Sequence, residues 1–283
     1  MFDKLIGRAR YERSRRRTVR AVRRSAARGR PVVVYTIGKT GSSTILATLG
    51  RHLPERPVLQ VHHLQPHRVE RSERSYRTMA RPAASRHVVA AQYLTRHAPP
   101  TAEAPWDVIT LVREPVAQDV SVFFQVGERR GFFALDEHGR LHDPPTVEGL
   151  VERFRTWRDH ADDARWFDED FEPSLGIDVY GEPFDHEAGY ATYVGGRARV
   201  LLLRNEDLRR VGSTALAEFL GIAPPPLVDA NVGHEKRYAA VYAEFRQRGV
   251  DAPLVDLLHG TKLAQHFYTT AERAEACARW VKK

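Results

Sequence analysis

Short apolar runs alternate with longer amphipathic stretches along the chain. Runs rich in β-branched and other apolar residues predict buried strands at residues 31–37, 58–61, 108–112 and 199–203. Amphipathic stretches predict helices at residues 44–49, 116–125, 147–166 and 213–220. Strands separated by helices of this length are typical of a parallel sheet that is covered on both faces. The pattern therefore predicts a three-layer α/β fold with a central parallel sheet.

Breaks in this pattern divide the chain into three segments. We expect a basic N-terminal arm over residues 1–30, an α/β domain over 31–223 and a helical C-terminal extension over 224–283 that packs on the same domain. Three consecutive prolines, Pro224 to Pro226, interrupt the chain at the last boundary, and proline cannot continue a helix. Thr269 and Glu272 have the spacing of a capping box, which predicts that a helix of the extension begins there.

Positive charge is concentrated at the N-terminus. The formal net charge is +8, yet residues 1–30 hold twelve basic and two acidic residues, so the rest of the chain is close to neutral. The apolar residues of this segment are sparse, which favours a flexible basic arm. Adhesion to an anionic membrane surface is the functional alternative for the arm, and specific nucleic-acid binding is not expected.

A second set of basic residues lies on one face of a predicted helix after the strand at 58–61. Arg71, Arg74, Arg77 and Arg81 recur at spacings of three and four. We interpret this face as a solvated surface, with a groove for an anionic substrate as the alternative.

Cysteine content and hydropathy bear on the compartment. Cys277 is the single cysteine, which fits a reducing environment because no internal disulfide can form. The basic N-terminus is not followed by the apolar core of a signal peptide, and no apolar run is long enough to span a membrane. We expect a cytoplasmic protein that could lie peripherally at the inner membrane face.

The turn after the first strand has the composition of a phosphate-binding loop. It consists of Gly38, Lys39, Thr40, Gly41, Ser42, Ser43 and Thr44. Small residues let the backbone approach phosphate, hydroxyls add donors, and the start of the following helix favours an anion. An ordinary tight turn needs the glycines but not a lysine and four hydroxyl residues.

The spacing differs from that of a nucleoside-triphosphatase P-loop. Only two residues separate Gly38 from Gly41, and the lysine lies between them. The strand at 108–112 ends in Arg113 rather than in a Mg²⁺-binding carboxylate, and Ser121 lies about two turns into the next helix. These residues predict a second phosphate site and no metal site.

Together these blocks resemble the sulfotransferases that use 3′-phosphoadenosine 5′-phosphosulfate. The family's strand, lysine-containing loop and helix are matched by residues 35–44, and its Arg-x-Pro followed by a serine is matched by residues 113–121. Residues 203–208 and 219–222 are similar to its Glu-Asp-Leu and Leu-Gly segments. The sequence also resembles a bacterial family of capsular polysaccharide synthesis proteins. This second resemblance rests on residues 166–167, 176–180, Asn231, Lys236 and Tyr238.

The resemblance implies a P-loop-like form of the α/β fold and sulfuryl transfer to a hydroxyl or amine of a glycan, glycolipid or small metabolite. Lys39 would neutralise charge on the leaving bridging oxygen. Residues Thr40 to Thr44 would hold the 5′-phosphate of the co-substrate, while Arg113 and Ser121 would hold its 3′-phosphate. No metal is implied.

The resemblance also points to a base at the end of the second strand. His63 is the preferred candidate because residues 61–64 resemble the Thr-His-Leu segment of the small-molecule branch, and His62 is the close alternative. The acidic and aromatic residues 166–187 favour a solvated loop, with an acceptor-binding loop as the alternative. Two other interpretations of the whole chain stay open, a small-molecule kinase and a non-catalytic protein that binds membrane or nucleic acid through its basic arm.

Overall fold

The structure is a computed structural model that describes residues 2–79, 82–142, 145–230 and 236–282. The chain divides into two compact units, each built from two separate stretches. The first unit comprises Met1–Val112 and Trp166–Val228, and the second comprises Arg113–Arg165 and Asp229–Lys283. The segment that was expected to extend one domain, 224–283, thus contributes mainly to a second unit together with residues 113–165.

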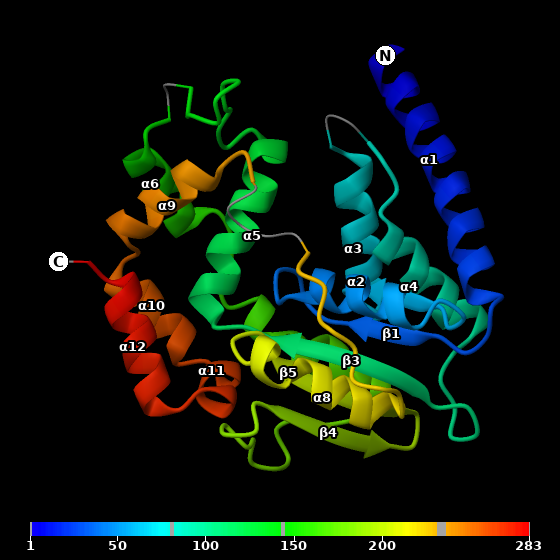
Figure 1. The fold of residues 1–283 in the computed structure, drawn as a ribbon. Helices are drawn as coiled ribbons and strands as arrows, with labels where there is room; N and C mark the ends of the chain where they lie inside the picture. Colours follow the sequence, from blue (N-terminus) through cyan, green and yellow to red (C-terminus); the bar gives the residue numbers. More distant parts are fainter. Residues whose placement is uncertain (1, 80–81, 143–144, 231–235, 283) are drawn as a thin grey trace. The chain divides into compact units, whose positions relative to one another are not determined.

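The first unit contains one five-stranded sheet (Figure 1). Its strands are β1 (Val32–Tyr35), β2 (Val58–Val61), β3 (Trp106–Val112), β4 (Tyr190–Gly195) and β5 (Ala198–Arg204). The strand order is β2-β1-β3-β5-β4, and every neighbouring pair is parallel except β4 with β5. The predicted α/β class is confirmed, the predicted parallel sheet holds except for the antiparallel β4, and the P-loop-like form of the fold stays a prediction.

Helices cover both faces of this sheet. Successive side chains of each central strand point to opposite faces, so both faces carry apolar residues that must be buried. Val32 and Val34 of β1 belong to a core shared with α2 (Ser42–His52) and α8 (Leu208–Leu220). On the other face, Tyr35 packs against Trp166, and α4 (Arg86–His97) packs against β2. Gly221 ends α8 in the left-handed conformation, as its position in the sequence predicts.

The basic N-terminal segment is a helix rather than a flexible arm. Helix α1 (Phe2–Ala26) packs against α4 and α3 (Pro66–Arg77), which run beside it in Figure 1. Tyr11 and Val22 are buried in this contact. Tyr11, Val19 and Val22 fall within about 80° of one another around the helix axis, which gives α1 a narrow apolar side. No helix in the described ranges is both long and apolar enough to cross a membrane.

The second unit is helical. Its main helices are α5 (Pro115–Arg130), α6 (Val147–Thr156), α9 (Ala239–Arg248), α10 (Ala252–His259), α11 (Lys262–Phe267) and α12 (Thr270–Trp280). Phe123, Phe124 and Phe154 pack against Phe245 of α9 in its aromatic core. The helix predicted to reach residue 166 ends at Thr156, and the capping box of Thr269 and Glu272 is confirmed.

Candidate functional site

The loop between β1 and α2 has the backbone geometry of a tight cradle. Lys39 has a φ of 71°, the only positive φ outside glycine in the described ranges, and Gly41 has a φ of 100°. A Cβ atom at Gly41 would overlap the side chain of Asn205. Glycine is therefore required at this position for two reasons, since its φ lies in the left-handed region and its neighbour is too close.

Buried hydroxyls hold the first half of the loop in shape. The Thr40 side chain is fully buried, its Oγ1 donates to the Ile37 carbonyl at 3.1 Å and it lies 2.8 Å from the Thr36 hydroxyl. Thr36 in turn donates to the Leu111 carbonyl of β3 at 2.9 Å. The Thr40 hydroxyl thus serves the loop itself, and a phosphate contact at Thr40 would have to use its backbone N–H.

The second half of the loop forms the start of α2. Ser42 begins the helix, and its hydroxyl accepts a hydrogen bond of 2.8 Å from Gln60 of β2. Ser43, Thr44 and Lys39 are half-buried, and the first turn of α2 holds no acidic residue. Partial positive charge at the helix start combines here with hydroxyl donors and a lysine, which is the chemistry of an anion site.

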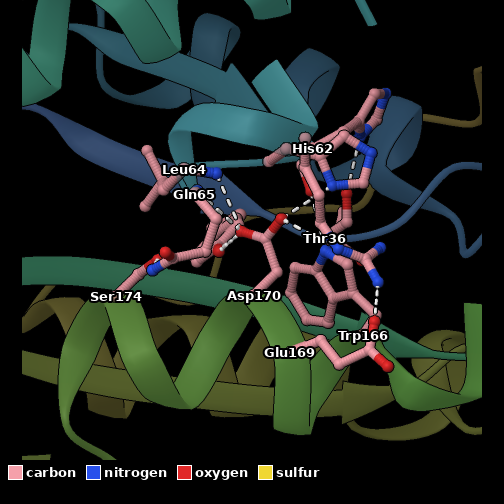
Figure 2. Close-up of polar contacts among 11 residues, drawn as sticks. Thr36, His62, Leu64, Gln65, Trp166, Glu169, Asp170 and Ser174 are labelled. Atoms are coloured by element: carbon pink, nitrogen blue, oxygen red, sulfur yellow. Dashed lines mark hydrogen bonds and ion pairs between the residues drawn. The ribbon is translucent and has the colours of Figure 1, made fainter. Parts of the chain in front are cut away.

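The predicted histidines lie beside this loop because β1 and β2 are parallel neighbours that end at one edge of the sheet. Tyr35 pairs with Val61, and the Thr36 N–H donates to the Val61 carbonyl. His62 Nδ1 donates to the Thr36 carbonyl at 2.6 Å, as Figure 2 shows. The structure therefore brings the 38–44 loop and the His62–His63 pair together.

His63 is held by a buried carboxylate that the sequence did not identify. His63 Nδ1 lies 2.9 Å from Oδ2 of Asp170, which is fully buried, and the exposed fraction of the His63 side chain is 24%. A carboxylate that accepts from Nδ1–H leaves the lone pair of the imidazole on Nε2. No described residue forms a hydrogen bond with Nε2. His63 thus has the tautomer and the exposure of a general base.

The other oxygen of Asp170 is occupied by donors from the first unit. Oδ1 accepts from the Tyr35 hydroxyl, from the Leu64 N–H at 2.8 Å and from the Gln65 N–H at 3.3 Å (Figure 2). Burial and the neighbouring Asp170 raise the pKa of Tyr35 well above its ordinary value, so the phenol stays protonated and donates. Asp170 Oδ1 is a fixed acceptor, which holds Oδ2 in place for His63.

Asp170 lies in a buried helical segment, so the solvated loop expected here is wrong for residues 166–171. Phe167–Phe171 forms one π-helical turn, followed by the short helix α7 (Glu172–Leu175). Trp166 and Phe171 pack on Tyr35, and their ring centroids lie 4.8 and 5.3 Å, respectively, from that of Tyr35. The Trp166 indole donates to the His62 carbonyl at 2.7 Å. Trp166, Phe167 and Phe171 all lie within four residues of Asp170 in the sequence. This cluster of large aromatic residues was the sequence signal for a buried carboxylate.

His62 has a different environment from His63. Its ring lies 4.2 Å from that of His87 at the start of α4, and its Nδ1 is bound to backbone. Burial, reinforced by His62 and His63, lowers the pKa of His87 to about 2, so His87 is neutral. His62 shapes the loop through Thr36, whereas His63 has the carboxylate partner.

Arg113 and Ser121 belong to the second unit. Arg113 directly follows β3, Ser121 lies in α5, and both are half-buried. Glu114 accepts hydrogen bonds from the Val116 and Ala117 N–H groups, from His259 and from the Trp280 indole. Helices α10 and α12 thus fix the turn that carries Arg113. The predicted contact of Arg113 and Ser121 with a 3′-phosphate stays a prediction.

Metal ligands are the remaining part of a site to consider. Across residues 2–79, 82–142, 145–230 and 236–282, no three His, Cys, Asp or Glu side chains are grouped so that they could hold a metal ion.

One family of known proteins is similar to part of the chain. The family model described as "Putative capsular polysaccharide synthesis protein" matches residues 146–269. No curated protein and no solved structure matches the chain.

The matched stretch includes Asp170 but not the 38–44 loop, His62 or His63. It supports the expected similarity to capsular polysaccharide synthesis proteins. Of the residues on which that expectation depended, Lys236 and Tyr238 begin the segment leading into α9, and Asn231 lies outside the described residues.

Proposed function

We propose that this protein is a sulfotransferase that uses 3′-phosphoadenosine 5′-phosphosulfate and acts on a glycan or glycolipid of polysaccharide synthesis. The observation that carries the proposal is the position of His63, oriented by Asp170, at the same sheet edge as the lysine-containing loop 38–44. An anion site beside a poised base is what transfer from a phosphorylated donor to a hydroxyl requires.

The chemistry assigns one task to each group. His63 Nε2 accepts the proton of the acceptor hydroxyl while its oxygen forms a bond to the sulfur of the donor. The bond between sulfur and the bridging oxygen of the 5′-phosphate breaks, and Lys39 neutralises the charge that develops on that oxygen. Asp170 stabilises the imidazolium that forms at His63. The products are the sulfated acceptor and adenosine 3′,5′-bisphosphate.

The two halves of the proposal have different support. The loop composition and the resemblance of residues 35–44 and 113–121 favour the nucleotide donor. The family similarity of residues 146–269 favours an acceptor from polysaccharide synthesis. In this proposal Arg113 and Ser121 bind the 3′-phosphate.

Titration calorimetry tests the donor half. The whole chain should bind adenosine 3′,5′-bisphosphate in the presence of EDTA, and Lys39→Ala should weaken this binding at least about tenfold, because it removes a charge-assisted contact. Lys262→Ala is the matched control, since this lysine begins α11 in the second unit. Absence of binding, or binding of ATP only with Mg²⁺, would reject the donor and favour a kinase.

A further inference from the structure

Helix α1 has two chemically distinct sides. Its inner side is fixed to the first unit by Tyr11, which donates to Glu73 of α3 at 2.9 Å, and by Ser14, which accepts from the Ala84 N–H at 3.1 Å. Val22 is fully buried on the same side. The helix therefore has a fixed orientation on the unit that carries it, and its outer side faces solvent.

Over residues 10–24 the outer side consists almost entirely of arginine. Seven arginines of α1 are exposed there: Arg10, Arg13, Arg16, Arg17, Arg20, Arg23 and Arg24. At about 100° per residue they fall within an arc of roughly 140°, opposite Tyr11 and Val22, and they extend over about 21 Å of the helix axis. None of the seven forms an ion pair with a described residue.

Repulsion among these arginines destabilises α1 when no anionic partner is bound to it. Arg10, Arg13, Arg17, Arg20 and Arg24 follow each other at spacings of three and four, so each lies beside like charges. A single anionic partner that contacts all of them would remove this repulsion.

Further basic residues lie on the inner side of α1, where it meets α3. Arg8 of α1 and the exposed Arg74 and Arg77 of α3 line a hollow of about 770 Å³ between the two helices, with Glu70 and Glu73 also in its wall. The Arg77 guanidinium lies over the Tyr11 ring, 5.5 Å from its centroid. This hollow lies on the Tyr11 side of α1, and none of the seven outer arginines lines it.

We propose that the outer face of α1 binds the surface of an anionic lipid bilayer. The arginine face is straight and convex, so a plane of headgroups can contact all seven guanidinium groups together, whereas a single polymer strand would have no groove to enclose it. Over residues 10–24 the face offers no aromatic side chain on which nucleic-acid bases could stack. Over the same residues it also lacks the large apolar side chains that insert into lipid, so binding through them is electrostatic. This inference is independent of the proposed activity.

Vesicle sedimentation with the whole chain tests the inference. Vesicles of phosphatidylcholine with phosphatidylglycerol should bind the protein, vesicles of phosphatidylcholine alone should not, and added salt should release it. The triple variant Arg13→Gln, Arg17→Gln, Arg20→Gln should bind on the order of 100-fold more weakly, since each basic residue near an anionic surface contributes about fivefold. Glutamine keeps the helix propensity of arginine, so helicity by circular dichroism should not change.

The matched control neutralises three exposed arginines on other helices: Arg51→Gln, Arg209→Gln, Arg279→Gln. This variant loses the same net charge and should keep most of the vesicle binding. Equal loss in both variants would show a general charge effect and overturn the proposal. Binding to DNA or heparin without binding to anionic vesicles would also overturn it and assign the face to a soluble polyanion.

Discussion

The two oxygens of Asp170 have separate partners, which makes a single substitution informative. Oδ1 accepts from Tyr35, Leu64 and Gln65, and the described residues that Oδ2 faces are His63 and the more distant Arg68. In Asp170→Asn the amide oxygen can keep the three donors, which places the NH₂ group against His63 Nδ1. The imidazole would then carry its proton on Nε2 and could no longer accept one there.

We therefore expect Asp170→Asn to lower kcat by about 100- to 10,000-fold while the protein stays folded. The measurement is steady-state kinetics of the proposed sulfuryl transfer to an acceptor glycan, alongside thermal unfolding. Tyr35→Phe is the matched control, because it removes a donor to Oδ1 and leaves the His63 contact intact. Equal losses of kcat in the two variants would mean that Asp170 acts only through the packing of the site.

At the scale of elements, the transition from β1 to α2 depends on Gly41. Alanine at a φ of 100° is strained by about 1–2 kcal/mol, and its Cβ would also displace Asn205. Gly41→Ala should weaken binding of adenosine 3′,5′-bisphosphate about tenfold or more in calorimetry, since about 1.4 kcal/mol corresponds to tenfold.

Gly50 offers a comparison within the same helix. A Cβ at Gly50 would meet no atom within 4 Å, and alanine is favoured over glycine in a helix by about 0.5–1 kcal/mol. Gly50→Ala should keep nucleotide binding and slightly raise the melting temperature. A loss of binding in Gly50→Ala as large as that in Gly41→Ala would contradict the cradle geometry.

Elements with a strong local pattern were predictable from the sequence. The run 31–37 begins with Pro31 and is followed by Gly38, which marks both of its ends. The strand predicted at residues 58–61 is β2. Strand β4 was missed because it is an edge strand with half-exposed residues, of which Val194 is 81% exposed. Helix α4 was missed as well, and its N-terminal His87 contributes to the environment of His62.

Site geometry was predictable only in part. The 38–44 loop and the His62–His63 pair follow adjacent strands, and this order along the chain indicates that they meet. Asp170 is 107 residues away from His63, and its place depends on a π-helical turn that no local periodicity reveals. The packing of α1 was also missed, because Tyr11 and Val22, its buried hydrophobic residues among the side chains described, give a weak apolar signal in a strongly basic segment.

At the scale of the whole molecule, stability of the second unit depends on a buried charge network. Asp119 of α5 accepts hydrogen bonds from Arg158 and from His160 Nδ1, while His160 Nε2 donates to the Arg155 carbonyl at 3.1 Å. With both ring nitrogens donating, His160 is an imidazolium. Burial alone would lower the pKa of His160, but the hydrogen bond and charge of Asp119 outweigh it and raise this pKa.

The sign of the pH dependence follows from that raised pKa. Protonated His160 stabilises the folded unit fully below its unfolded pKa of about 6.5, and this stabilisation is lost as the pH rises through the higher folded pKa. His160→Gln should lower the free energy of unfolding by about 2 kcal/mol at pH 5.5 and by less at pH 8.5, measured with urea. A difference between the two proteins that grows with pH would contradict this assignment.

Because each unit is built from two separate stretches of the chain, neither unit can be completed until its second stretch has been synthesised. Strand β3 is complete at Val112, but its neighbour β5 begins only at Ala198. One hydrogen-bonding edge of β3 therefore has no partner strand until β5 has been synthesised. Glu114 is synthesised 166 residues before Trp280, which donates to its buried carboxylate. At translation rates of about 5–20 residues per second this interval is on the order of ten to thirty seconds. The nascent chain exposes an open strand edge until β5 is synthesised and an unsealed carboxylate until Trp280 is synthesised, so we expect it to bind chaperones.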